Sequence, residues 1–240
     1  MPKKIALVTG ASRGIGAAVV RRLHADGYTV VLNYLYSEDR ALALAEELGG
    51  TALGCDVSDP EQVGKMIDSV LEKFCQLDVL VCNAGVAWQG LTQDMGDEAY
   101  RRVMGTDLDG AFYCCRAALP QMIRQKEGRI VLLSSMWGQT GGACEVAYSA
   151  AKAGLIGLGK ALAKEVGPSG ITVNVVAPGV IDTEMNAALG PEALEALAEE
   201  TPLGRTGTVE DVAAAVSFLC GEGGAFFTGQ VLSPNGGLVI

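Results

Sequence analysis

Three nearly continuous apolar runs that end in small residues limit most strongly how this chain can fold. The runs "KIALVTG", "LDVLVCNAG" and "GRIVLLSS" lack a regular alternation of polar and apolar residues. Such strands suit a parallel sheet that is covered on both faces. Helical patterns separate the runs, and we expect strands near 4–9, 29–33, 51–55, 78–82, 129–134, 171–176 and 230–232. We expect helices near 14–26, 38–48, 60–75, 97–125, 147–166 and 208–220.

This order of strands and helices predicts an α/β protein with a doubly wound (Rossmann) sheet of seven parallel strands and helices on both faces. No Pro/Ser-rich linker, charge block or repeat divides residues 1–240, so we expect one domain. The acidic, Ala/Leu-rich segment 184–204 interrupts the alternation of strands and helices, and we expect it to be a substrate lid.

Composition excludes several classes of protein. Charged residues make up 19% and apolar residues 49%, which argues against disorder. The net charge of −10 argues against nucleic acid and anionic membranes as partners. The seven cysteines form no CxxC pair, which favours free thiols. The apolar runs are too short to span a membrane, and the first residues lack a signal-peptide pattern. We therefore expect a cytoplasmic protein. The single histidine, His24, and the absence of ligand spacing predict no metal site.

The first strand runs directly into "TGASRGIG" at 9–16, just before a helix. Glycines there leave backbone N–H groups bare, and a helix N-terminus attracts phosphate, so this loop is a candidate pyrophosphate site. The same glycines are also compatible with a turn that needs them for steric reasons alone. The candidate residues of the loop are Gly10, Ser12, Arg13, Gly14, Ile15 and Gly16.

The end of the second strand predicts which dinucleotide binds. NAD sites of this kind carry an acid there for the ribose 2′-hydroxyl, whereas this chain has Asn33 and Tyr34. Without a carboxylate, a 2′-phosphate can pair with Arg13, so we expect NADP(H). The alternative for Arg13 is a solvated loop cation.

Tyr148 and Lys152 lie four residues apart in "AYSAAKAG" and therefore on one face of a predicted helix. The pair is either a phenol held ready for proton transfer by an ammonium or an ordinary amphipathic helix with a solvated lysine. This spacing alone does not decide between the two.

Several motifs in order resemble the short-chain dehydrogenase/reductase family over essentially the whole chain. They are "TGASRGIG", Asp56 in "CDV", "NAG" at 83–85, Ser135, Tyr148 with Lys152, and "PGVIDT" at 178–183; Ser135 precedes Tyr148 by 13 residues, as is usual in the family. The resemblance implies an NADP-binding fold over 1–240 and further cofactor contacts from Asn33, Asp56, Val57, Asn83, Ala84, Gly85, Tyr148, Lys152, Pro178, Gly179, Ile181 and Thr183. Asn83–Gly85 can also be a strand-end turn, and Asp56 a turn or helix-start acid.

The resemblance also implies a mechanism of ketone reduction. Tyr148 protonates the carbonyl oxygen, Ser135 hydrogen-bonds that oxygen, and Lys152 binds the nicotinamide ribose. Lys152 and the positive ring of an oxidised nicotinamide together are expected to lower the tyrosine pKa from about 10. One position departs from the family, because "TDLDG" places Asp107 where an asparagine is usual. We expect Asp107 to be a fourth site residue near Lys152, or otherwise a plain surface acid.

Two groups within the family are candidates for the substrate. "AKAGLIGLGKALAKE" and "ITVNVVAPG" resemble 3-oxoacyl-[acyl-carrier-protein] reductases, which dock an acidic carrier protein; Arg129 is one expected docking residue, but Ser169 stands at the second. "SSMWGQTGGACEVAYSAAK" resembles reductases of the 5-aminopentanone group on modified elongation factor P. Glu145 suits a substrate ammonium or caps a helix, and Trp137 contacts substrate or closes the pocket wall.

A different class of function stays open beside the reductase. The alternative is a nucleotide sensor or scaffold without turnover, but Ser135, Tyr148 and Lys152 are all present, which favours an enzyme. The family resemblance also implies a homotetramer.

Overall fold

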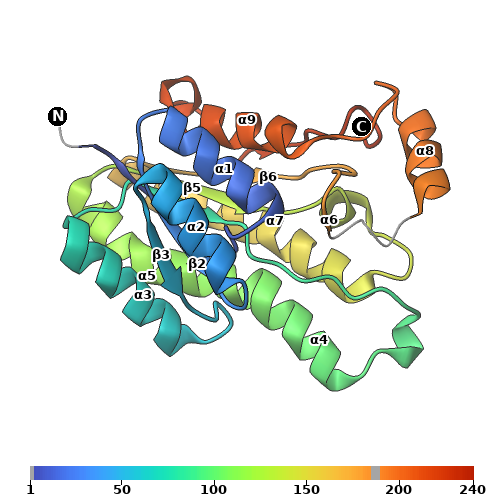
Figure 1. Cartoon of the computed structure of the whole chain (residues 1–240), viewed down its shortest axis with the longest axis horizontal. Coiled ribbons are helices and arrows are strands. Elements are labelled where there is room, and N and C mark those ends of the chain that lie inside the picture. The colour runs from blue at the N-terminus through green and yellow to red at the C-terminus, as the bar shows by residue number, and fades with distance from the viewer. Residues whose placement is uncertain (1–2, 185–189) are drawn as a thin grey trace.

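A parallel sheet forms the centre of the computed structural model, which describes residues 3–184 and 190–240 (Figure 1). Its order in the described residues is β3-β2-β1-β4-β5-β6-β7, and every pairing is parallel. The strands are β1 (Ile5–Val8), β2 (Thr29–Tyr34), β3 (Thr51–Gly54), β4 (Val79–Cys82), β5 (Gly128–Leu133), β6 (Ile171–Val176) and β7 (Val231–Leu232). The predicted doubly wound sheet and the places of its strands are confirmed.

Helices connect the strands and cover both faces of the sheet (Figure 1). They are α1 (Gly14–Ala25), α2 (Glu38–Leu48), α3 (Pro60–Phe74), α4 (Asp97–Met104), α5 (Gly110–Gln125), α6 (Trp137–Thr140), α7 (Val146–Val166), α8 (Pro191–Glu200) and α9 (Val209–Cys220). The faces follow from the alternation of side chains along each strand. In β1, Ile5 and Leu7 pack in the cluster that holds α3, α5 and α7, whereas Ala6 and Val8 pack with α1, α2 and α9.

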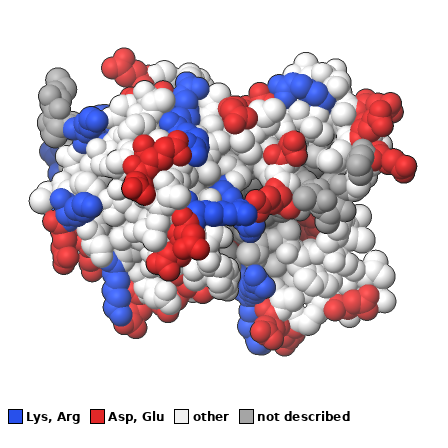
Figure 2. Space-filling model, viewed as in Figure 1, with Lys and Arg blue, Asp and Glu red and all other residues white. Residues whose placement is uncertain are grey.

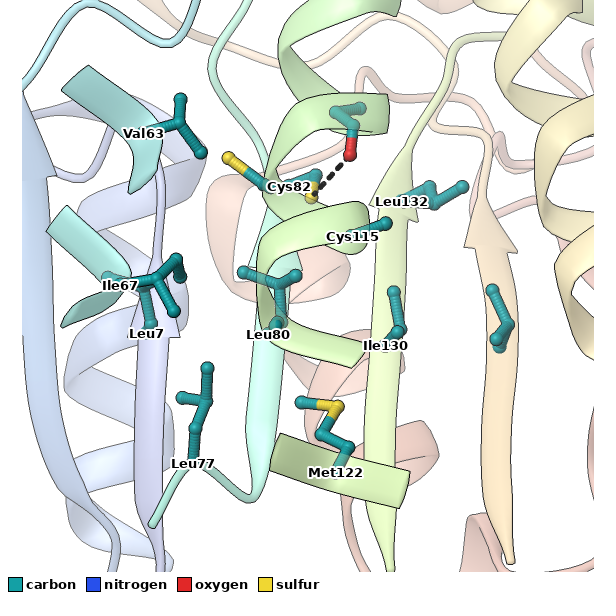
Figure 3. Packing of buried hydrophobic residues seen from close by; sticks show 14 of the residues in the cluster. Leu7, Val63, Ile67, Leu77, Leu80, Cys82, Cys115, Met122, Ile130 and Leu132 are labelled. Atoms are coloured by element: carbon teal, nitrogen blue, oxygen red, sulfur yellow. Dashed lines mark hydrogen bonds between the residues drawn. The ribbon is translucent and has the colours of Figure 1, made fainter. Parts of the chain in front are cut away.

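Figure 3 shows how the first of these two layers is filled. Leu7, Leu80 and Ile130 come from the neighbouring strands β1, β4 and β5 and are fully buried under Ile67 of α3 and Met122 of α5. Burying one such side chain completely stabilises the fold by about 1.5–3 kcal/mol. Apolar packing of this kind on both faces explains why the strands read as continuous apolar runs.

The helical pattern near 97–125 forms one continuous helical segment, as the sequence predicts, but its hydrogen bonding is not that of an α-helix throughout. A π-helical turn at Gly105–Asp109 separates α4 from α5. The short helix α6 and the helix α8 were also not predicted. Helix α8 lies in the expected lid segment 184–204, of which residues 185–189 fall outside the described residues.

The sheet order places a crevice at one point. The chain builds outward from β1 to β2 and β3, then returns to build β4 to β7 on the other side. Loops after β1 and β4 therefore leave the same edge of the sheet in opposite directions, which is where doubly wound proteins bind their ligands.

Candidate active site

The loop after β1 has a backbone that only glycine accommodates well. Gly10 and Gly14 have φ angles of +62° and +53°, in the left-handed region. A Cβ on Gly16 would lie 2.4 Å from the Gly10 carbonyl oxygen, which is too close for any side chain. Helix α1 then begins without a side-chain cap, so its first N–H groups remain for a ligand. This local geometry fits a pyrophosphate.

Thr9 and Asn83 bind the loops after β1 and β4 to each other. The Asn83 side-chain amide donates to the carbonyl oxygens of Thr9 (2.9 Å) and Gly10 (3.0 Å). The Thr9 hydroxyl accepts from the backbone N–H groups of Asn83 (3.0 Å) and Ala84 (3.1 Å). Asn83 therefore acts as a structural clamp at the strand ends, and it also lines the cleft beside them.

Asn33 stands at the end of β2 and holds the glycine-rich loop from the other side. Its Oδ1 accepts from the Gly10 N–H at 3.2 Å, and its Nδ2 donates to the carbonyl of Cys55 at 3.0 Å. The residue is almost completely buried. The amide therefore shapes the rim of the cleft mainly through backbone contacts.

The cleft collects most of the residues predicted to hold the cofactor. These are Gly10, Ser12, Arg13, Gly14, Ile15, Gly16, Asn33, Asp56, Val57, Asn83, Ala84, Gly85, Tyr148, Lys152, Pro178 and Thr183. Gly179 and Ile181 do not line it: the Ile181 side chain is buried in the core, and a Cβ on Gly179 would lie 2.8 Å from Cα of Asn235.

Asp56 closes a turn at the edge of the cleft. Its Oδ1 accepts from the backbone N–H of Ser58 (2.9 Å) and from the Ser58 hydroxyl (2.7 Å), so the residue closes a turn. The same residue lines the cleft. Asp59, three residues later, is the acid that caps α3.

Tyr148 and Lys152 lie one turn apart on α7, as the sequence predicts, and both face the cleft. The Lys152 ammonium is buried 5.4 Å from the centre of the Tyr148 ring and donates to the Leu133 carbonyl at 3.0 Å. Ser135 lies two residues after the end of β5, and its hydroxyl accepts from the Trp137 N–H at 3.2 Å. Its neighbour Ser134 lines the cleft, whereas Ser135 forms a side-chain hydrogen bond with Tyr148. A solvated lysine is therefore wrong for this pair.

Asp107 forms a buried ion pair with Lys152. Its Oδ2 lies 3.0 Å from the Lys152 Nζ, and its Oδ1 accepts from the Val86 N–H at 2.8 Å. The π-helical turn places this side chain inward, where it is 1% exposed. A plain surface acid is therefore the wrong interpretation. The carboxylate is also close to Gly85, where a Cβ would lie 2.8 Å from Oδ2.

The pKa values of these groups follow from burial and charge. The pKa of Tyr148 is raised above its usual value. Burial is the largest cause; Lys152 acts against it, and the charge of Asp107 adds to it. Lys152 has the lowering effect that we expected, but among the protein's own groups the loss of solvation outweighs it and leaves the pKa of Tyr148 raised. Burial lowers the pKa of Lys152, but Asp107 reverses this effect and leaves that pKa raised. The pair thus keeps a protonated phenol beside a charged lysine.

Glu145 is the N-cap residue of α7, but its side chain makes no capping hydrogen bond. No first-turn N–H donates to its side chain, and the carboxylate has no hydrogen bond or ion pair with a described residue. Half-burial raises its pKa. The residue thus stands at the predicted N-cap position, but no capping hydrogen bond occupies the carboxylate, so the charge is available to a ligand. Trp137, the other predicted substrate residue, begins α6 and is half-buried.

Several residues around the cleft were not predicted from the sequence, and three of them are polar or charged residues at its rim. Ser37 and Arg40 stand at the start of α2, and Glu184, which follows β6, forms an ion pair with Arg40. A basic residue in the first turn after β2 is a signal that could have pointed to Arg40. Glu184 had no such signal, because its partners are distant in the sequence.

The described residues offer no other obvious ligand chemistry. None of their helices is both long and apolar enough to cross a bilayer. Within the same ranges, no group of three or more His, Cys, Asp or Glu side chains is placed to hold a metal ion. Each cysteine there is a free thiol.

A doubly wound sheet, a glycine-rich loop before a helix, and a Tyr–Lys pair with a nearby serine define a dinucleotide-dependent oxidoreductase. A family model described as enoyl-(acyl carrier protein) reductase matches residues 10–239. The chain belongs to the short-chain dehydrogenase/reductase family.

The alignments with similar proteins extend over almost the whole chain. The 3-oxoacyl-[acyl-carrier-protein] reductase FabG of Staphylococcus aureus is 42% identical over 99% of this chain and 98% of its own. The enzyme of the same name from Escherichia coli is 40% identical, with the same coverage. A solved structure of a blue fluorescent protein from a metagenomic library, in complex with NADPH, superposes with a TM-score of 0.91 at 38% identity; the match covers 99% of this chain and 98% of that one.

Proposed function

We propose that this protein reduces the ketone of a 3-oxoacyl thioester to an alcohol with NADPH. The observation that carries the proposal is the Tyr148 phenol and Lys152 ammonium in one cleft with the glycine-rich loop. The named activity of the Staphylococcus aureus and Escherichia coli relatives supports the thioester, and the NADPH complex of the similar structure supports the cofactor.

The residues present fit a phosphate-rich dinucleotide. The uncapped start of α1 and the glycines suit its pyrophosphate, and Arg13 suits a 2′-phosphate. Lys152 and Pro178 line the same cleft and would hold the nicotinamide ribose and ring. When bound, the reduced nicotinamide supplies the hydride.

The protein's own groups supply the proton and stabilise charge. Tyr148 Oη donates its proton to the substrate carbonyl oxygen, and Ser135 Oγ donates a hydrogen bond to the same oxygen. The raised pKa of Tyr148 keeps the phenol protonated near neutral pH. Asp107 holds Lys152 charged and oriented through the buried ion pair, and is therefore a positioning residue.

Carriage of the thioester on an acyl carrier protein is part of the proposal, but the single chain offers little for docking. Arg129 is the second residue of β5, whereas Ser135 comes after the last residue of that strand. Arg129 therefore lies at the end of the strand that is away from Ser135. Basic and acidic side chains are interspersed over the face in Figure 2, where the described residues form no broad basic patch. The net charge of −10 also disfavours an acidic partner.

Reduction of the 5-aminopentanone group on modified elongation factor P is the second candidate, and Glu145 favours it. The carboxylate is half-buried without a partner among described residues, and it is close enough to Tyr148 to raise the pKa of the phenol. A cationic ketone would give Glu145 an opposite charge. A neutral acyl thioester would not.

Glu145→Gln separates the two candidates, because it keeps the shape and removes the charge. For an aminopentanone, the second candidate predicts a loss in kcat/KM of about ten- to hundredfold, the scale of ~1.5–3 kcal/mol for a hydrogen bond to a charged group. For the neutral acetoacetyl thioester of N-acetylcysteamine, kcat/KM stays the same. The matched control is Glu165→Gln, an exposed acid near the far end of the same helix. Equal effects on both ketones would remove the second candidate.

A homotetramer is the assembly we propose. Large apolar side chains remain exposed in the single chain, including Phe112 and Ile123 on α5 and Phe226 and Ile240 near the C-terminal end. Contact between copies would remove this apolar surface from water. Sedimentation equilibrium should give a four-chain species, and a monomer would refute the assembly.

A further inference from the structure

Two arginines from different parts of the chain converge on one carboxylate at the rim of the cleft. Arg13 precedes α1 and Arg40 lies in the first turn of α2. Their Nη1 atoms lie 2.7 Å and 2.8 Å from the two oxygens of Glu184. All three side chains are more than half exposed, so a solute can reach the cluster.

The cluster lies at the end of the cleft where the adenosine ribose of a dinucleotide is expected. Arg13 and Glu184 line the cleft itself, together with Ser37 after the end of β2. A second hollow beside it is lined by Arg13, Tyr36, Ser37, Glu38, Asp39 and Arg40. In doubly wound sheets, residues that follow the second strand contact the substituent at the ribose 2′ position of the dinucleotide.

We propose that Glu184 occupies the position of the cofactor's 2′-phosphate and competes with it, and that Arg40 is a second phosphate-binding residue beside Arg13. The proposal rests on the use of NADPH. It adds an internal competitor that sets how strongly NADPH is bound and preferred.

Charge decides the direction of the exchange. A phosphate monoester carries close to two negative charges and three acceptor oxygens, whereas Glu184 offers one charge and two oxygens. The contacts that Glu184 gives up are exposed ion pairs, which are weak because water and salt screen them. NADPH therefore displaces Glu184 at low cost. NADH has no 2′-phosphate to replace the carboxylate and leaves the two arginines paired with Glu184.

Glu184 is a competitor throughout the neutral range. Hydrogen bonds from Arg13 and Arg40 hold the pKa of its carboxyl below the usual range, so it stays ionised. Asp39, on the same rim, carries the same charge but forms no bond to either arginine. It provides a control for the general effect of negative charge.

Calorimetric titration with adenosine 2′,5′-bisphosphate and with AMP tests the competition without a ketone. Glu184→Gln should tighten the bisphosphate about three- to tenfold, the scale of one or two exposed ion pairs, and leave AMP unchanged. Asp39→Asn should have a clearly smaller effect on the bisphosphate. Unchanged or weaker bisphosphate binding by Glu184→Gln, or equal tightening of AMP, would overturn the proposal.

Removal of the arginines completes the test. Arg40→Gln should weaken the bisphosphate and spare AMP; equal bisphosphate affinity would remove Arg40 from the site. In the double variant Arg13→Gln/Arg40→Gln, the gain from Glu184→Gln should vanish, and a persistent gain would contradict competition for these arginines. If the parent protein bound both nucleotides equally, the NADPH preference itself would be wrong, which is a separate result.

Discussion

At the scale of single residues, Asp107 is the feature that most distinguishes the chemistry of this site. A buried carboxylate beside a buried lysine is stable only as a well-oriented pair, and here the second oxygen is also bonded to the Val86 N–H. Its charge reaches the phenol as well, since Asp107 raises the pKa of Tyr148. The residue thus links the charge of the lysine to the acidity of the tyrosine.

Asp107→Asn should shift the pH profile of ketone reduction to lower pH. The reduction needs the protonated phenol, so its rate falls as pH rises through the pKa of Tyr148, and removal of a charge that raises this pKa moves the fall downward. Measurement of kcat against pH with an acetoacetyl thioester checks the direction. The same variant leaves Lys152 without its partner and should lower stability by about 3–5 kcal/mol.

The control for Asp107→Asn is Asp109→Asn, two residues later in the same π-helical turn. Asp109 is exposed and forms no ion pair with a described residue. Its replacement should leave both the pH profile and the melting temperature close to those of the parent. A profile for Asp107→Asn that stays in place or moves to higher pH would contradict the assigned coupling.

At the scale of elements, the sequence predicted the strands and the long helices well, because apolar runs and helical periodicity report burial directly. It did not predict the π-helical turn at Gly105–Asp109, since the residue pattern before and after this turn is that of an ordinary helix. The contact of Glu184 with Arg13 and Arg40 also escaped prediction. Such contacts depend on how distant segments fold together, and no local pattern records them.

The loop between β1 and α1 offers a test at this scale. In Gly16→Ala, the new Cβ would lie 2.4 Å from the Gly10 carbonyl and 2.6 Å from Asn83 Nδ2, so the loop and its clamp must move. We expect a stability loss of about 1–3 kcal/mol and NADPH binding weakened by at least about tenfold. Chemical denaturation and a binding titration give the two values.

Gly64→Ala is the matched control for this glycine. The position lies within α3 and has nothing within 4 Å of its added Cβ. The alanine should therefore stabilise the protein by about 0.5–1 kcal/mol and leave NADPH binding unchanged. If Gly16→Ala bound NADPH as tightly as Gly64→Ala does, the loop would not be the cofactor cradle.

At the scale of the whole molecule, the site exists only because the sheet brings together the ends of several segments. The cleft joins residues that follow β1, β2, β3, β4 and β6 with two residues of α7. Each motif alone has a structural interpretation, and Asn83 and Asp56 do serve as a clamp and a turn acid. Because the motifs lie in one cleft together with Tyr148 and Lys152, the site indicates a reductase rather than a nucleotide-binding scaffold.

The most direct test of that claim is the rate of Tyr148→Phe with NADPH and an acetoacetyl thioester, with NADPH affinity measured on the same samples. The change removes only the phenolic hydroxyl, so the fold and NADPH binding should be retained. We predict that kcat falls by about a hundredfold or more, the scale of a lost general acid. Turnover within a few-fold of the parent would contradict the assignment and make the Tyr148–Lys152 pair structural.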